Sequence, residues 1–312
     1  MKVLLTGANG FLAKAIEPRL RAAGYEVLTT DQRGDVDFLG DLAEHPFTQS
    51  LPDVDSVVHC AAVQYVSADI PLIRRERFFE RNNVVATTNL VSRYSGTVDF
   101  FLNIGTSMMY DQTGLSEYST NSPMRGQGVY SRSKFSAYQR VSRMDNPTAT
   151  MIPAIIGGEG REGLFRNFVS TMTKYNVALC PGPGTHLTHM VHVLDAAELA
   201  VLILGKKLPG KFNAAGPDPL SINNWVDIIQ QELSLKSVRR LHVPFKPIEF
   251  GGWASGYRAI AREQVLMLNK DHVLSTVDSL AIGWAPKFTN ERIVRDIARY
   301  IAGSPAHTLS AA

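Results

Sequence analysis

The chain has 312 residues, of which 45% are hydrophobic and 20% are charged, and its 32 basic and 29 acidic side chains give a formal charge of +3. This length accommodates one large α/β domain or two closely packed ones. The balanced charge lacks the excess or clustering of basic residues that is typical of proteins that bind nucleic acid or a membrane surface. We therefore expect neither as a partner.

The cysteines, the first residues and the lengths of the apolar runs indicate the cellular compartment of the protein. Cys60 and Cys180 do not show the paired spacing of a metal knuckle or a disulfide framework, which favours a reducing environment. The first residues lead directly into an apolar strand, without the basic and apolar regions of a signal peptide. No apolar run approaches the roughly 18–20 residues of a membrane-spanning helix. We expect a cytoplasmic protein.

Short apolar runs alternate with longer amphipathic segments in the first half of the chain. The predicted strands are the runs near 3–5, 26–28, 56–59, 100–104 and 150–152. The predicted helices lie at roughly 11–23, 72–94 and 129–143. Strands that are apolar nearly throughout are buried on both faces, as in a parallel sheet covered by helices. The sequence predicts an α/β fold with a Rossmann-type, doubly wound parallel sheet.

A glycine-containing turn follows the first predicted strand and opens the first predicted helix. Its cofactor-binding candidates are Gly7, Asn9, Gly10, Phe11 and Leu12. Glycines permit a tight turn and a close approach of the backbone to a pyrophosphate, whose charge then meets the free N–H groups of the helix N-terminus. In this context the turn predicts a dinucleotide site.

Acidic residues after the next two strands extend this site. Asp31 ends the second strand about 20 residues beyond Gly10, where a carboxylate can accept hydrogen bonds from the adenosine ribose. Its charge favours NAD, because it would repel the 2′-phosphate of NADP, whereas Arg33 keeps NADP open. Asp41, followed by Leu42, could meet the adenine edge or be a solvated loop acid.

Tyr130 and Lys134 are four residues apart on a predicted helix, so their side chains project from one face. A tyrosine with a pKa of about 10 is a poor base near neutral pH, and an adjacent ammonium stabilises its phenolate. The helix follows the fifth strand, and Thr106 and Ser107 lie at the carboxyl end of that strand. We expect Thr106, or in second place Ser107, to hold the reacting oxygen of a substrate.

The pattern changes after residue 157, where glycine and proline turns become frequent and the elements follow a less regular order. We expect residues 1–157 to form the dinucleotide-binding domain and residues 158–302 mainly a smaller, mixed α/β substrate-binding lobe, followed by a tail at 303–312. Segments near 189–193 and 211–214 read as strands that could rejoin the main sheet.

Three histidines of the second half, His186, His189 and His192, are closely spaced. A metal site needs ligands that converge on one point, each oriented by a further hydrogen bond. The sequence shows neither property, and we expect no metal.

Taken together, these motifs make the chain resemble an extended short-chain dehydrogenase/reductase of the NAD-dependent epimerase/dehydratase superfamily. The matching pieces are Thr6 to Ala13, Asp31, Gly40 to Leu42, His59 to Ala62, Asn82 to Val84 with Thr87 and Asn89, Thr106 four residues before Tyr110, Tyr130 with Lys134, Val191 to Val193 before Asp195, and Gly283 to Pro286. They span roughly residues 1–290.

The resemblance implies roles for individual residues. Tyr130 is expected to be the general acid/base, Lys134 to lower its pKa and bind the nicotinamide ribose, and Thr106 to complete the triad. The further expected cofactor contacts are Ala61, Ala62, Asn82 and Pro153. Asn82 has an alternative reading as a residue that caps or turns the chain. The family's usual arrangement also implies a homodimer.

The substrate is less defined. Superfamily members that dehydrate nucleotide sugars typically have Asp and Glu after the triad hydroxyl, where this chain has Ser107 and Met108. Methionine cannot transfer a proton, which argues against a dehydratase. The asparagine and an arginine that hold the diphosphate of nucleotide sugars correspond to Ile155 and Thr188, although Arg161, Arg166, Arg258 and Arg262 could substitute.

These departures favour hydride transfer at a secondary alcohol or ketone carbon of a small or medium organic substrate. The C-terminal segment resembles the 3β-hydroxysteroid dehydrogenase and dihydroflavonol reductase branches, and the aromatic residues Phe245, Phe250, Trp253 and Tyr257 could line such a pocket. A nucleotide-sugar epimerase that oxidises its substrate transiently uses the same triad and stays open. A non-catalytic NAD(P)-binding regulator is a further alternative, but such proteins usually lose the tyrosine or lysine that this chain retains.

Overall fold

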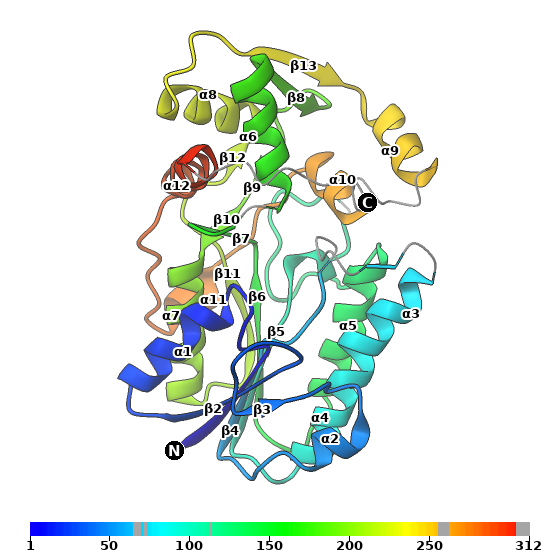
Figure 1. Cartoon of the computed structure of the whole chain (residues 1–312), viewed down its shortest axis with the longest axis vertical. Coiled ribbons are helices and arrows are strands. Elements are labelled where there is room, and N and C mark those ends of the chain that lie inside the picture. Colours follow the sequence, from blue (N-terminus) through cyan, green and yellow to red (C-terminus); the bar gives the residue numbers. More distant parts are fainter. Residues whose placement is uncertain (65–69, 72–73, 113, 162, 255–261, 304–312) are drawn as a thin grey trace.

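The computed structural model describes residues 1–64, 70–71, 74–112, 114–161, 163–254 and 262–303. A main sheet of parallel strands runs through its centre in the order β11-β6-β5-β4-β1-β2-β3 (Figure 1). Its strands are β1 (Lys2–Thr6), β2 (Glu26–Asp31), β3 (Phe38–Leu39), β4 (Ser56–His59), β5 (Phe100–Ile104), β6 (Thr148–Pro153) and β11 (Gly210–Ala214). The predicted doubly wound parallel sheet is confirmed.

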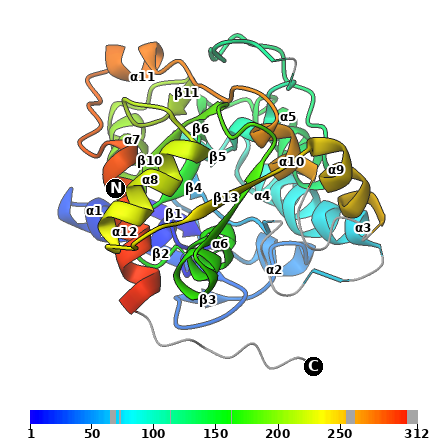
Figure 2. The same cartoon turned by 90° about the horizontal axis from the view of Figure 1, so that it is seen from above.

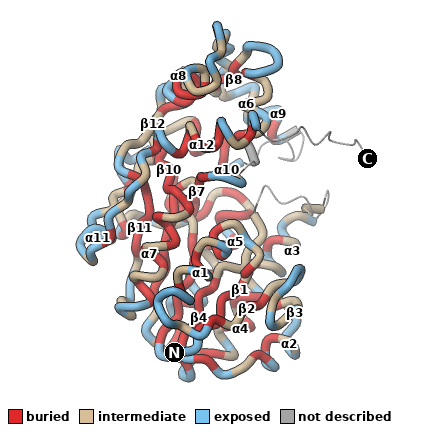
Figure 3. The backbone as a smooth tube through the Cα atoms, turned by 60° about the vertical axis from the view of Figure 1, so that its left-hand side comes forward, coloured by how far each residue is buried: buried red, intermediate tan, exposed pale blue. Residues whose placement is uncertain are grey.

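Burial on both faces explains why the central strands β1 and β5 are mainly apolar. On β1, Val3 and Leu5 pack into one hydrophobic core while Leu4 packs into the other, as the alternation of side chains along a strand requires. All three are fully buried, and Figure 3 shows buried segments running through the interior of the fold. The two cores hold the helices against the sheet.

Helices cover the two faces of the main sheet. One face packs against α1 (Ala13–Ala22) and α7 (Val193–Lys206). The other is covered by α2 (His45–Gln49), α3 (Arg75–Phe79), the π-helical turn η1 (Glu80–Val85), α4 (Ala86–Tyr94) and α5 (Val129–Val141) (Figure 1). The helix predicted at 72–94 is therefore interrupted by a π-helical turn, and its positions 72 and 73 lie outside the described residues.

A second lobe stacks on the end of the main sheet where the strands have their carboxyl ends (Figures 1 and 2). It consists of α6 (Gly163–Tyr175), β8 (Val177–Pro181), α8 (Ile222–Glu232), β13 (Arg239–Val243), α9 (Phe245–Ala254), α10 (Arg262–Leu268) and α12 (Asn290–Gly303). Its separate hydrophobic core includes Val169, Trp225 and Ile297. Across the described ranges no helix has both the length and the apolar character needed to cross a membrane.

Short strands connect the main sheet to the second lobe. Of the two later segments that could rejoin the sheet, β11 does so by pairing with β6. The segment near 189–193 does not, because β10 (Met190–His192) pairs with β7 (Ile155–Gly157) in a separate sheet. Strand β11 occupies the edge of β6 that would otherwise be free. Strand β10 therefore pairs with β7, which follows β6 in the chain. The remaining elements are β9 (Leu187–Thr188), β12 (Leu220–Ser221), α11 (Val277–Ala281) and the 3₁₀ turn η2 (Ser107–Met109).

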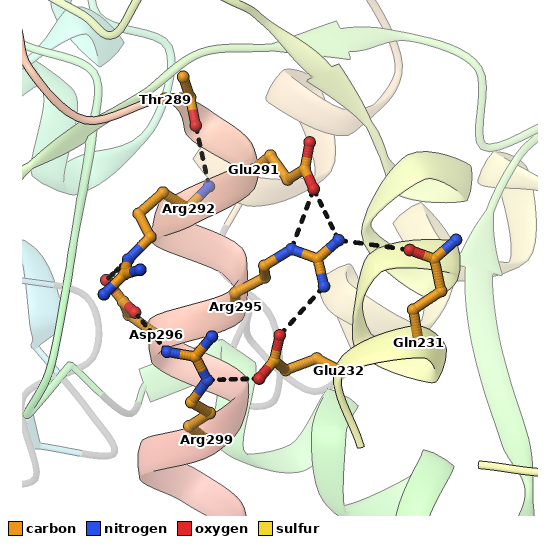
Figure 4. A network of polar contacts seen from close by, with 8 residues as sticks. All are labelled: Gln231, Glu232, Thr289, Glu291, Arg292, Arg295, Asp296 and Arg299. Atoms are coloured by element: carbon orange, nitrogen blue, oxygen red, sulfur yellow. Dashed lines mark hydrogen bonds and ion pairs between the residues drawn. The ribbon is translucent and has the colours of Figure 1, made fainter. Parts of the chain in front are cut away.

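Ion pairs join α8 to α12 in the second lobe (Figure 4). The Glu232 carboxylate accepts a hydrogen bond from Arg295 at 3.0 Å and also pairs with Arg299. Glu291 and Asp296 pair with arginines on their own helix. The Glu232 side chain is 14% exposed, so water screens this charge incompletely. Hydrogen bonds from Arg299 and Arg295 lower the pKa of Glu232.

Removing this charge will destabilise the fold. We expect Glu232→Gln to lower the free energy of unfolding by about 1–2 kcal/mol near neutral pH, because two arginines lose their shared anion. A carboxyl group with a depressed folded pKa stabilises the fold fully above its unfolded pKa of about 4.3. That contribution is lost as the pH falls through the lower folded pKa. Urea unfolding at pH 7 and at successively lower pH measures both effects.

Glu17→Gln is the matched control, since Glu17 pairs with Arg21 on the surface of α1. Its effect should stay below about 0.5 kcal/mol. A difference between Glu232→Gln and the wild type that persists unchanged into strong acid would contradict the proposed contribution of the carboxylate.

Candidate active site

A main cavity of about 350 Å³ lies at the carboxyl ends of β1, β5 and β6. A smaller cavity of about 170 Å³ adjoins it, and Gly7, Gly10, Cys60 and Ala62 line both. Strand β1 pairs with β2 on one side and β4 on the other, so the chain reverses its winding here. Open α/β sheets bind ligands at such a reversal, outside the carboxyl ends of the strands.

The glycine turn has the backbone geometry that the sequence requires of it. Gly7 has φ +65°, and a Cβ atom there would lie 2.6 Å from the Cα atom of Ala61, so no larger residue fits. Leu12 precedes α1 and provides no side-chain cap, and the first turn of α1 contains no acidic residue. The backbone N–H groups at the N-terminus of α1 can therefore bind an anion. Phe11 and Leu12 also line the main cavity.

Asp31 lines the smaller cavity and organises the loop around it. Its carboxylate accepts hydrogen bonds from the backbone N–H groups of Asn9 at 3.0 Å and Gln32 at 2.7 Å. The Asn9 side chain donates to the Arg33 carbonyl at 2.6 Å. Asn9 and Arg33, both predicted cofactor contacts, line neither cavity; Asn9 instead ties the glycine turn to the end of β2.

Asp41 belongs to a polar cluster beside the smaller cavity. It pairs with Arg81 at 2.5 Å and accepts a hydrogen bond from the Gln32 side chain at 2.9 Å. It does not line the cavity, and its partly exposed carboxylate holds η1 against the loop after β3. Leu42 and Asn82 do line this cavity, and the Asn82 amide donates to the Phe78 carbonyl at 2.8 Å.

Tyr130 and Lys134 lie in the first two turns of α5, and both line the main cavity together with Thr106. Tyr130 is 6% exposed and Lys134 3%. The rings of Phe79 and Tyr130 pack against each other at an interplanar angle of 62°, with 6.1 Å between ring centroids. A phenol, an ammonium and a hydroxyl thus share one largely buried cavity. Such a set can donate or accept a proton at a substrate oxygen.

Burial controls the charge of Lys134. Desolvation lowers its pKa to about 8, so the ammonium form still predominates at neutral pH. Within the described part of the chain it makes no ion pair with an acidic side chain. Burial raises the pKa of the Cys60 thiol to about 12, and burial together with Lys134 lowers the pKa of His59 to about 3. Both neighbours stay neutral, so neither of them offsets the charge of the ammonium.

Ser107 has a partner that sequence reasoning did not find. Its Oγ atom lies 2.8 Å from Nε2 of the fully buried His272, whose Nδ1 atom lies 3.1 Å from Oε1 of Gln112. The Gln112 amide nitrogen donates to the Tyr110 carbonyl, so its oxygen faces the ring and Nδ1 carries the proton. Nε2 then accepts the Ser107 proton.

This arrangement bears on the two hydroxyl candidates. The Ser107 proton is committed to His272, and burial lowers the pKa of that imidazole to about 4 and keeps it neutral. Thr106 is half-buried, and its hydroxyl accepts a hydrogen bond from the Met108 N–H at 3.4 Å, which leaves its proton available. Thr106 is therefore the better hydroxyl donor. His272 lies 165 residues from Ser107 in a segment without a motif, so no signal in the sequence could have paired them.

The residues predicted near the nicotinamide and the substrate are only partly in the main cavity. Pro153, a predicted cofactor contact, and Ile155, a predicted substrate contact, line it, whereas Thr188 is buried in β9. Arg161 also lines the cavity, where its guanidinium group donates to Gln64 at 2.9 Å and lies 5.7 Å from the centre of the Phe11 ring. Of the candidate arginines that the structure describes, Arg161 is the one that lines this cavity. Arg258 lies outside the described residues.

The aromatic residues expected near the substrate lie elsewhere. Phe250 and Trp253 are each 67% exposed on α9 and line a separate surface hollow with α10. Phe245 packs against the core of the second lobe, and Tyr257 lies outside the described residues. The expectation of an aromatic pocket is wrong for the first two, because α9 lies at the outer edge of the second lobe (Figure 1).

The three histidines do not converge. His186 lies 3.5 Å from the Asp271 carboxylate, His189 accepts a hydrogen bond from the Leu274 N–H, and His192 stacks on Phe288. Over the residues that the structure describes, no group of three or more His, Cys, Asp or Glu side chains could hold a metal ion.

Comparisons with known proteins agree with this architecture. The spore coat polysaccharide biosynthesis protein SpsK of Bacillus subtilis is 27% identical over 250 residues, covering 76% of this chain and 81% of SpsK. Among solved structures, the UDP-glucose 4-epimerase of Thermus thermophilus in complex with NAD superposes with a TM-score of 0.77 at 18% identity, covering 98% and 100% of the two chains.

Two further structures are similar. The UDP-glucuronic acid 4-epimerase of Bacillus cereus in complex with NAD has a TM-score of 0.73 at 16% identity, covering 97% of this chain and 99% of that one. The human epimerase family protein SDR39U1 with NADPH has a TM-score of 0.76 at 17% identity, covering 96% and 99%. Residues 3–215 match the sequence model of the NAD dependent epimerase/dehydratase family. This chain belongs to the NAD dependent epimerase/dehydratase family.

Proposed function

We propose that the chain is an NAD-dependent oxidoreductase that acts at a secondary alcohol or ketone carbon of a small or medium organic substrate. The observation that carries the proposal is that Tyr130, Lys134 and Thr106 line one cavity together with the glycine turn, with Tyr130 and Lys134 buried. A non-catalytic NAD-binding regulator could use Lys134 to bind the nicotinamide ribose, but it would have no need of a phenol and a hydroxyl placed beside it for proton transfer.

The residues of the two cavities suit a dinucleotide. The uncapped N-terminus of α1 and the close-packed Gly7 would receive the pyrophosphate, and Asp31 would accept hydrogen bonds from the adenosine ribose. Lys134 and Pro153 would lie near the nicotinamide end, in the main cavity. When bound, NAD supplies the acceptor and donor of hydride that no side chain provides.

The protein's own part of the reaction is proton transfer and positioning. The Thr106 hydroxyl would donate a hydrogen bond to the reacting oxygen and hold it near the Tyr130 phenol. For alcohol oxidation the Tyr130 phenolate would accept the hydroxyl proton, and for ketone reduction the phenol would return it. The Lys134 ammonium favours the phenolate through its charge, so Tyr130 can act near neutral pH.

The lining of the main cavity supports an uncharged or weakly charged substrate. Met108 and Ile155 occupy positions where proton transfer or diphosphate binding would need polar side chains, and Thr188 is buried in β9. Arg161 provides one guanidinium group at the cavity, already hydrogen-bonded to Gln64.

A nucleotide-sugar 4-epimerase is the second candidate. It is supported by the titles of the two similar epimerase structures and by the name of SpsK, a polysaccharide biosynthesis protein. The same triad serves both reactions. The difference is whether the keto intermediate rotates in the site, so that hydride returns to its other face. Purified protein that retains tightly bound NAD would favour the epimerase, and free exchange of NAD would favour net oxidation or reduction.

A substrate panel tests the proposal. Purified protein is incubated with NAD or NADH and with alcohols, ketones and UDP-, GDP- and dTDP-sugars, while NADH absorbance and product stereochemistry are followed. We expect net NADH formation or consumption with an alcohol or ketone. Epimerised nucleotide sugar without net NADH change would replace the proposal by the second candidate. No turnover with any class, despite NAD binding, would contradict both.

Asp31 is expected to set cofactor preference. We expect Asp31→Ala to raise the ratio of kcat/KM for NADP to that for NAD by about 10- to 100-fold, because the carboxylate no longer repels the 2′-phosphate. Asp35→Ala is the control, since Asp35 is exposed on the same loop and lines neither cavity. Steady-state kinetics with both cofactors measure the ratio. An unchanged ratio would remove Asp31 from the adenosine site.

A further inference from the structure

Helix α5, which carries Tyr130 and Lys134, has no side-chain acceptor at its N-cap residue, although the Ser131 hydroxyl accepts a hydrogen bond from the Gly128 N–H at 2.9 Å. Its N-cap residue is Gly128, whose φ of −112° and ψ of 176° are extended backbone that any residue adopts. Residues with side-chain oxygens are preferred at this position because they accept hydrogen bonds from the first N–H groups of the helix. The glycine is therefore not explained by backbone conformation.

The explanation is a carboxylate from the second lobe. Glu263, on α10, lies 132 residues from Ser131, and its Oε1 atom accepts hydrogen bonds from the Ser131 backbone N–H at 3.0 Å and the Ser131 hydroxyl at 3.2 Å. A Cβ atom on Gly128 would lie 2.0 Å from the Glu263 carboxyl carbon. Glycine leaves the space that the carboxylate fills, and Glu263 is only 5% exposed.

This contact acts on the turn of α5 that bears the phenol. Tyr130 is the second residue of the helix, directly before Ser131, whereas Lys134 is one turn further on. The partial positive charge of a helix N-terminus attracts a carboxylate, and the effect is confined to the first turn. Loss of the cap lets that turn fray, which would displace Tyr130 before it displaces Lys134.

We propose that Glu263 is a positioning residue: from the second lobe it caps α5 and fixes Tyr130 relative to Lys134 and Thr106. This inference rests on the proposed function in taking Tyr130 as the catalytic acid/base. It also assigns Gly128 a purpose, which is to admit the carboxylate. The second lobe thereby contributes to the order of the proton-transferring helix as well as to the cavity lining.

A double-mutant cycle tests the proposal. Glu263→Ala should lower kcat about 10-fold through loss of a charged cap, with the KM for NAD changed less than about 2-fold. Gly128→Asp alone should also lower kcat, because its side chain meets the Glu263 carboxylate. Combining the two restores an acceptor at the N-cap and gives it room. We expect the double variant to recover to within about 3-fold of the wild type.

Glu263→Gln is the conservative control, because its amide oxygen can still accept from Ser131. It should stay within about 3-fold of the wild type in kcat. If Glu263 only filled space between α10 and α5, adding Gly128→Asp to Glu263→Ala would not restore kcat. Additive losses in the double variant would overturn the proposal.

Hydrogen exchange of the backbone N–H groups of residues 129–133 in the NAD-bound protein supplies a readout that needs no substrate. Protection should fall in Glu263→Ala and return in the double variant. Unchanged protection in Glu263→Ala would overturn the cap, and lost protection with unchanged kcat would overturn the positioning of Tyr130. If Tyr130→Phe keeps full turnover, the proposed function fails, while the exchange pattern still decides whether Glu263 caps α5.

Discussion

Tyr130→Phe is expected to lower kcat by about 10³- to 10⁴-fold, because the variant keeps the ring but removes the group that donates and accepts the proton. The Phe79 contact involves the ring, so the shape of the main cavity should be preserved. Binding of NADH, followed by fluorescence titration, should change less than about 3-fold, since the variant removes one hydroxyl group and keeps Lys134 and the glycine turn.

Tyr138→Phe is the matched control for this variant. Tyr138 lies two turns further along α5, packs against Phe135 and does not line the main cavity. We expect its kcat to equal that of the wild type. Full turnover in Tyr130→Phe, measured with the substrate that the panel identifies, would exclude Tyr130 as the acid/base and leave the cavity without a proton donor of the proposed kind.

Lys134→Met is expected to have opposite effects on activity and stability. Turnover should fall by about 10²-fold or more, because the phenolate of Tyr130 loses the neighbouring charge that favours it. The free energy of unfolding at pH 7 should rise by about 1–3 kcal/mol, since a methionine of similar size avoids the desolvation of a buried ammonium. Residues at functional sites often reduce stability in this way.

The pH dependence of that stability difference follows from the lowered pKa of Lys134. Burial brings the folded pKa to about 8, below the ordinary value of 10.5. Between these two values the unfolded chain holds a proton that the folded chain has released, so wild-type stability rises with pH in this window. The advantage of Lys134→Met should therefore be largest below about pH 8 and shrink towards pH 10.

Denaturant unfolding at pH 7 and pH 10 measures this advantage, with Lys174→Met as the control on the exposed surface of α6. The control should change stability by less than about 0.5 kcal/mol at either pH. A Lys134→Met variant that is less stable than the wild type at pH 7 would contradict this prediction. It would mean that favourable interactions of the ammonium outweigh the cost of its desolvation.

Patterns confined to a few neighbouring residues made the fold predictable from the sequence. Nearly continuous apolar runs such as that at β5 indicated strands buried on both faces, and a glycine turn between a strand and a helix indicated where an anion could bind. The spacing of Tyr130 and Lys134 placed both on one helix face. Each inference depends on local backbone geometry, which propensity and periodicity report directly.

Tertiary structure decided the contacts between distant segments. Competition for the free edge of β6 admitted β11 and excluded β10. The pairing of Ser107 with His272 left Thr106 as the available hydroxyl. Neither result has a signature in sequence spacing, because each depends on which surfaces meet after folding.

The N-terminus of α5 shows the same division between sequence and structure. The sequence indicated a helix that begins near residue 129, but it offered no reason for Gly128 and no role for Glu263. Packing of α10 against that end of the helix brings a buried carboxylate to the Ser131 N–H. A helix is determined by local preferences, whereas the partner of its terminal N–H groups is determined by whichever polar atom the folded chain places there.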